Sequence, residues 1–216
     1  MGAATPVLLL HAAGRTPQMW QDQVEAIGMS RPALAPWLRG LRPGRKDELS
    51  LADAADEVLS TLDRNGIEAA HLVGHQLGAM VALQVAATEP TMVAGLVLSG
   101  AVVAPSSMAM GLQRMVIRLL PNKSLAESGA TKADLLRALD LIATADFGKN
   151  LDRITAPALI IAGSGDPGRS AAQVLADRLP HGRYAEIAGV GSDPSLEAPA
   201  AYNQLLMEFL SSSSAR

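Results

Sequence analysis

Gly74-His75-Gln76-Leu77-Gly78 lies between a short apolar run, Ala70-His71-Leu72-Val73, and a segment of small and apolar residues at 79–83. An apolar run of this length is typical of a buried strand, and the longer segment that follows is typical of a helix. Glycines stand two residues before and two residues after Gln76, where they permit a sharp turn. The pattern therefore predicts a strand, a tight turn with Gln76 at its tip, and a helix.

Such a strand, turn and helix form the frame of a nucleophile elbow, which pushes one side chain into a pocket. Here that side chain is the amide of Gln76, which cannot act as the serine, cysteine or aspartate nucleophile of such a turn. A residue other than glycine at the tip is expected to be strained by about 1–3 kcal/mol. The amide could hydrogen-bond to a ligand or only fill the pocket, and the sequence leaves both readings open.

Composition and charge limit the class of protein. Of the 216 residues 49% are hydrophobic and 18% are charged, and the net charge is −3. This is sufficient for a substantial core and gives no basic surface for nucleic acid or an anionic membrane. The absence of cysteine excludes disulfides, thiolate metal sites and cysteine catalysis. Because we find neither a signal peptide nor an apolar run of membrane-spanning length, we expect a cytoplasmic protein.

Short apolar runs alternate with amphipathic segments along most of the chain. Ser50 is expected to cap one helix, with Asp53 as its capping-box partner, and Asn65-Gly66 to end it. The alternation predicts an α/β fold with about six mostly parallel strands and helices on both faces. Ligands of such sheets bind beyond the carboxyl ends of the strands. The expected strands are 6–10, 33–35, 70–73, 95–99, 158–162 and 183–187, and the expected helices are 19–27, 51–62, 77–88, 171–179 and 200–210.

Residues 103–151 depart from this alternation, because they hold helical patterns without strands. Since the segment follows a strand, we expect a helical lid over the strand ends, inserted into a core formed by residues 1–102 and 152–216. Methionines suit an adaptable apolar pocket wall, which makes Met108 and Met115 candidates for ligand contact. The alternative is that the segment adds core helices and that its methionines only fill space.

Four stretches in order resemble motifs of the α/β-hydrolase superfamily, in its lid-bearing branch of esterases, lactonases and carbon–carbon hydrolases. The resemblance covers nearly the whole chain and implies the α/β-hydrolase fold. It also implies an oxyanion hole made by the backbone amides of Ala13 and Leu77, a bracing role for His11, and Asp166 as the acid of a Ser-His-Asp triad. It implies neither a metal nor an organic cofactor. The four stretches are 7–14 with Trp20, 71–78, 157–166 and 189–199.

The chain departs from the superfamily pattern at three positions. The serine of the family falls on Gln76, its histidine falls on Ser192, and Trp37 stands where many relatives carry an aspartate. No other histidine is expected to replace the missing one. His181 precedes a strand at the opposite edge, and the remaining three, His11, His71 and His75, are expected to be structural.

What remains is a set of anion-stabilising amides and one carboxylate. Asp166 is the best candidate for an acid or base, Ser192 and Asp193 are secondary candidates, and Trp37 is a candidate for ligand contact. We expect the site to act on or bind a small apolar carbonyl compound by non-hydrolytic chemistry, as a lyase, cyclase or isomerase does. The alternatives are a ligand-binding pseudo-hydrolase and an ester or lactone hydrolase whose serine and histidine have been replaced. No nucleic-acid or membrane partner is expected, and the chain is expected to be a monomer or homodimer.

Overall fold

The computed structural model describes residues 4–42, 49–101, 107–125, 130–145, 147 and 150–213. Within them six strands form one sheet in the order β2-β1-β3-β4-β5-β6, and all neighbouring pairs are parallel. The predicted parallel sheet is therefore confirmed, with β3 and β4 somewhat longer than the apolar runs alone indicate. The strands are β1 (Val7–Leu10), β2 (Ala33–Leu34), β3 (Ala70–His75), β4 (Val93–Ser99), β5 (Ala158–Gly163) and β6 (Gly182–Ile187).

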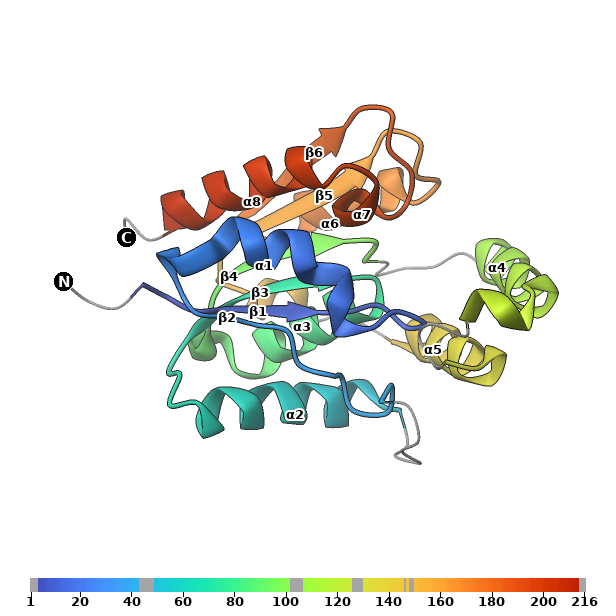
Figure 1. Cartoon of the computed structure of the whole chain (residues 1–216), viewed down its shortest axis with the longest axis horizontal. Coiled ribbons are helices and arrows are strands. Elements are labelled where there is room, and N and C mark those ends of the chain that lie inside the picture. Colours follow the sequence, from blue (N-terminus) through green and yellow to red (C-terminus); the bar gives the residue numbers. More distant parts are fainter. Residues whose placement is uncertain are drawn as a thin grey trace.

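Helices cover both faces of the sheet, with α1 and α8 on one face and α2, α3 and α6 on the other (Figure 1). The helices are α1 (Gln21–Ile27), α2 (Leu51–Arg64), α3 (Leu77–Thr88), α4 (Ser107–Leu119), α5 (Lys132–Thr144), α6 (Arg169–Arg178), α7 (Pro194–Glu197) and α8 (Pro199–Ser213). No helix in this described part of the chain is both long and apolar enough to span a membrane.

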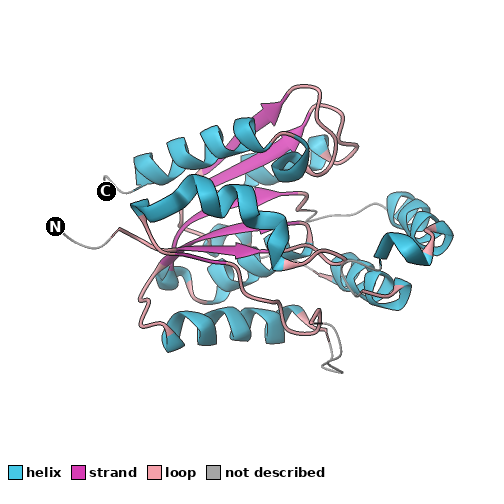
Figure 2. Ribbon diagram, in the orientation of Figure 1, coloured by secondary structure: helices cyan, strands magenta, loops and turns pink. Residues whose placement is uncertain are grey.

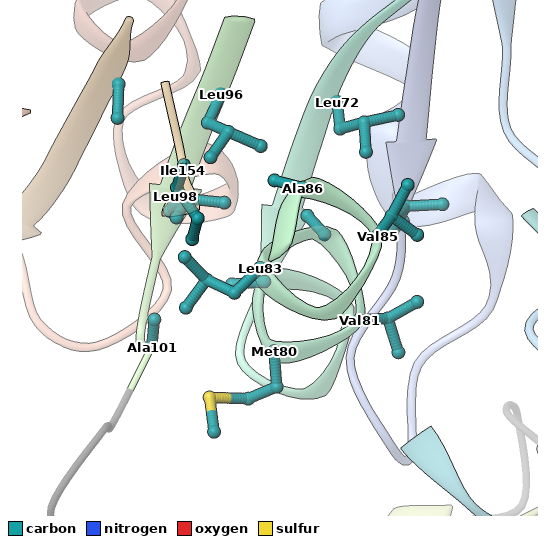
Figure 3. Packing of buried hydrophobic residues seen from close by; sticks show 14 of the residues in the cluster. Leu72, Met80, Val81, Leu83, Val85, Ala86, Leu96, Leu98, Ala101 and Ile154 are labelled. Carbon is teal, nitrogen blue, oxygen red and sulfur yellow. The ribbon is translucent and has the colours of Figure 1, made fainter. Parts of the chain in front are cut away.

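The side chains of the central strands alternate between two cores. In β1, Leu8 and Leu10 pack with α2 and α3, whereas Val7 and Leu9 pack with α1 and α8. This is the period of two that an extended strand imposes, and it is why strands covered on both faces are apolar at every position. Figure 3 shows the first of these cores, in which α3 packs against β3 and β4.

The start of α3 lies against the end of β1 because Gly78 has no side chain. A Cβ atom at Gly78 would lie 2.0 Å from the carbonyl oxygen of Leu10, which is closer than any real contact. This approach brings the turn at Gln76 next to the loop that follows β1. The two loops that the sequence assigns to one site therefore meet at the carboxyl edge of the sheet.

The helices between β4 and β5 lie beyond the carboxyl ends of the strands (Figures 1 and 2). Helix α5 packs on α3, and its Ala138 joins the main core, whereas α4 rests on α5 through Met110 and Ile117. Met108 and Met115 are 86% and 54% exposed on the outer side of α4. Their proposed contact with a ligand stays a prediction that this arrangement does not support.

Candidate functional site

Gln76 has the backbone conformation of an elbow tip. Its φ is 48° and its ψ is −111°, and it is the sole residue other than glycine with a positive φ in the part of the chain described above. Its N–H donates to the carbonyl of Ser99 over 2.8 Å, and its own carbonyl accepts from Met80 over 3.1 Å. Gly100 leaves room for the side chain, because a Cβ there would lie 2.8 Å from Cγ of Gln76. The surrounding strands therefore hold a conformation that glutamine disfavours.

The amide of Leu77 is the first of α3 and has no acceptor inside the helix, as at every helix start. Ala13 lies on the loop after β1, just before Gly14, whose φ of 76° turns the chain. A Cβ on Gly14 would lie 2.8 Å from Leu135 of α5, so this helix packs directly over the loop. The oxyanion role of both amides remains a prediction.

His11 braces the loop after β1 in its neutral form. Its Nδ1 donates to the carbonyl of Ala12 over 2.9 Å, and its Nε2 accepts from the N–H of Leu38 over 3.1 Å. Burial lowers the pKa of His11 to about 4, so the ring carries no charge at neutral pH. The ring of Trp37 meets it edge-on, with 5.2 Å between the ring centroids. Trp37 therefore packs against the brace from the loop that follows β2.

Asp166 and Ser192 lie together, at the two positions where the superfamily carries its acid and its histidine. The hydroxyl of Ser192 donates to Oδ1 of Asp166 over 3.1 Å, and the N–H of Gly168 donates to the same oxygen over 2.8 Å. Among the described residues no hydrogen bond ends on Oδ2. The loop thus fixes one carboxylate oxygen of Asp166.

A second chain of polar side chains, which the sequence did not reveal, runs behind the elbow. Nδ1 of His75 lies 2.9 Å from Oγ of Ser99, and Nε2 lies 2.7 Å from Oδ1 of Asp193. Because a carboxylate only accepts, Nε2 donates its proton to Asp193. His75 and Ser99 are fully buried, so the hydroxyl and the imidazole have no direct access to a substrate, whereas the carboxylate of Asp193 is 22% exposed.

Asp193 closes this chain at the protein surface, where the guanidinium of Arg15 donates to its Oδ2. The hydrogen bond from His75 is the main reason that the pKa of Asp193 falls to about 2, and Arg15 lowers it further, against the raising effect of burial. Asp193 is therefore an anion at neutral pH. In the sequence, a histidine inside the elbow motif together with an acid in the last loop could have indicated the hydrogen bond between His75 and Asp193.

The loop after β6 connects Asp166 with the buried His75, since Ser192 of this loop contacts Asp166 and Asp193 contacts His75. Glu197, which the sequence did not single out, holds this loop by accepting from the N–H groups of Gly191 and Asp193 over 2.7 and 2.9 Å. Among the residues that the structure describes, no three histidine or acidic side chains form a metal site.

Several proteins of similar sequence carry the same description. A protein from Pseudomonas savastanoi pv. phaseolicola named "Putative carbamate hydrolase RutD" is 26% identical, over 96% of this chain and 95% of its own. A protein of the same name from Variovorax paradoxus is 30% identical, over 97% of this chain and 92% of its own.

Solved structures share the fold at lower identity. The enol-lactonase from Burkholderia xenovorans LB400 is 20% identical, with a TM-score of 0.83 over 97% of this chain and 92% of that one. Est816, described as an N-acyl homoserine lactone degrading enzyme, is 22% identical, with a TM-score of 0.79 over 96% and 94%. The model of the alpha/beta hydrolase family matches residues 7–205. With its parallel sheet, its strained turn at Gln76 and this match, the chain belongs to the alpha/beta hydrolase family.

Proposed function

We propose that this protein binds a small apolar carbonyl compound at the turn around Gln76 and acts on it without forming an acyl-enzyme. The observation that carries the proposal is the strained tip itself, which presents an amide where a nucleophile would stand. The Ser192 hydroxyl on Asp166 supports it, because no imidazole lies at that position to shuttle a proton.

The chemistry that remains is the removal of a proton from the carbon next to a carbonyl group. Oδ2 of Asp166 takes the proton, the C–H electron pair forms a C=C bond, and the carbonyl π pair moves onto oxygen. The N–H groups of Ala13 and Leu77 would stabilise that oxyanion, as preorganised backbone donors do. Asp166 then returns the proton to the same atom or to another, which makes the step the common start of isomerase and lyase chemistry.

Hydrolysis is the second candidate, and the names of the RutD relatives favour it. Without a nucleophile at position 76, water would attack the carbonyl carbon directly and give its proton to Asp166 while the leaving group departs. The buried chain of Ser99, His75 and Asp193 supplies no route to an acyl-enzyme, because its hydroxyl is fully covered.

Deuterium exchange tests the proposal without knowledge of the natural substrate. We expect the protein to exchange the α-protons of 2-pentanone with D2O, followed by NMR, and we expect Asp166→Asn to slow exchange by roughly a hundredfold or more. Asp177→Asn, the same change at an exposed position of α6, is the matched control. Binding of the ketone without exchange would favour a ligand-binding protein, and absence of binding would contradict the proposal altogether.

A fluorophosphonate probe tests the absence of a serine nucleophile. The wild-type protein should not be labelled and should not cleave p-nitrophenyl acetate above the buffer rate. The double variant Gln76→Ser, Ser192→His puts a hydroxyl at the tip and an imidazole beside Asp166, so it should gain both reactions. Adding Asp166→Asn to that variant should remove most of the gain. Labelling of the wild type would show that a nucleophile is present.

A further inference from the structure

Arg15 is a cation on the loop after β1 that the proposed chemistry leaves without a role. It follows Gly14 and stands two residues after Ala13, and its side chain is 48% exposed. Its guanidinium donates through one terminal nitrogen to Asp193, and the described residues give that group no other side-chain partner. Since a guanidinium has five N–H donors, most of them remain for a ligand.

Asp193 holds Arg15 in a fixed position. Oδ1 of Asp193 accepts from His75 over 2.7 Å, and His75 is itself held by Ser99 over 2.9 Å. Both of these supporting side chains are fully buried. The guanidinium is therefore oriented before a ligand arrives, which reduces the entropy lost on binding.

The surroundings of Arg15 place it beside the other groups of the site. Asp193 follows Ser192, which contacts Asp166, so the cation and the carboxylate are held by adjacent residues of one loop. Leu135 of α5 lies over Gly14, the residue before Arg15, and adds an apolar side chain to this loop. The loop after β1 thus carries both the proposed oxyanion donor, Ala13, and a cation.

We infer that the substrate is a carbonyl compound that also bears a carboxylate, and that Arg15 binds this carboxylate. The inference rests on the proposed function and narrows its substrate class. A guanidinium can present two edges to carboxylates, so Asp193 keeps one edge while the ligand takes the other. The bound carboxylate would direct the carbonyl group toward the amides of Ala13 and Leu77.

Two probes of similar size test the inference, 4-oxopentanoate as the keto acid and 2-pentanone as the neutral ketone. NMR titration of the wild-type protein should show that the keto acid binds roughly tenfold more tightly, since a charge-assisted hydrogen bond has about this effect. The variant Arg15→Gln should lose this preference while its affinity for 2-pentanone stays unchanged. In the wild type, high salt should weaken binding of the keto acid alone.

The control is Arg64→Gln, which removes an arginine paired with Glu57 on the surface of α2 and should keep the preference. Equal binding of the two probes by the wild type, or an undiminished preference in a folded Arg15→Gln variant, would overturn the inference and leave the proposed function standing. If Arg15→Gln fails to fold, the wild-type comparison of the two probes and its salt dependence decide alone. If neither probe binds the wild type, the proposed function fails, and this inference fails with it.

Discussion

At the scale of single residues, the backbone of Gln76 stores strain that can be measured. Its φ of 48° lies in the region that favours glycine, so Gln76→Gly should raise the free energy of unfolding by about 1 kcal/mol. Chemical denaturation of the two proteins gives the difference. The control is Gln84→Gly in the middle of α3, which should lower stability by about 1 kcal/mol. A loss of stability in Gln76→Gly would mean that contacts of the amide outweigh the strain.

The same residue explains why the site could be located from sequence although its chemistry could not. The glycines at 74 and 78 fix the strand, the turn and the helix, because each allows a close backbone approach: a Cβ at Gly74 would lie 2.6 Å from backbone atoms of α3. The contact at Gly74 is local, within a few residues of the tip, whereas Gly78 approaches Leu10 of β1. The partners of His75 come from β4 and from the loop after β6, and nothing in the local pattern around the elbow specifies them.

At the scale of elements, the start of α2 depends on one side chain. The hydroxyl of Ser50 accepts from the N–H of Asp53 over 3.0 Å, as predicted for the cap, whereas the carboxylate of Asp53 accepts from this hydroxyl over 2.6 Å in place of the backbone N–H that the predicted capping box requires. We expect Ser50→Ala to lower the free energy of unfolding by about 1 kcal/mol. Ser60→Ala, at an exposed position of the same helix, should leave stability unchanged or raise it slightly. Equal effects of both changes in urea denaturation would contradict a capping role.

The strands and the helices that cover the sheet were predicted well, and so was the helical character of α4 and α5, but the packing of α4 was not. The strands alternate between two cores, so their apolar runs can be read directly. In α4 the spacing indicates a helix, but it does not say which apolar face is buried. Met110 and Ile117 face α5, whereas Met108, Leu112 and Met115 are exposed. The position of α5 decides which apolar face of α4 is buried. This packing of two helices is a tertiary contact, which the sequence of α4 alone does not specify.

At the scale of the whole molecule, buried histidines should make the fold sensitive to acid. Burial lowers the pKa of His11 and of His71 from 6.5 to about 4, and neither ring nitrogen of His71 has a hydrogen-bond partner among the described residues. As the pH falls below 6.5, the unfolded chain therefore takes up protons before the folded chain does. The free energy of unfolding should decrease between pH 6.5 and 4, by up to about 3 kcal/mol for each histidine.

Below pH 4 the loss should continue through Asp193, whose pKa of about 2 lies under the ordinary value of 3.8, so its stabilisation disappears as it is protonated. Urea denaturation from pH 7 to 3 measures both ranges.

His71→Leu keeps an apolar side chain against Phe209 and removes one titrating ring, so it should flatten the pH dependence of the free energy of unfolding between pH 6.5 and 4 by about half. His181→Gln, which changes an exposed histidine outside both cores, is the control variant. An unchanged slope in His71→Leu would mean that His71 binds its proton equally in the folded and unfolded chains.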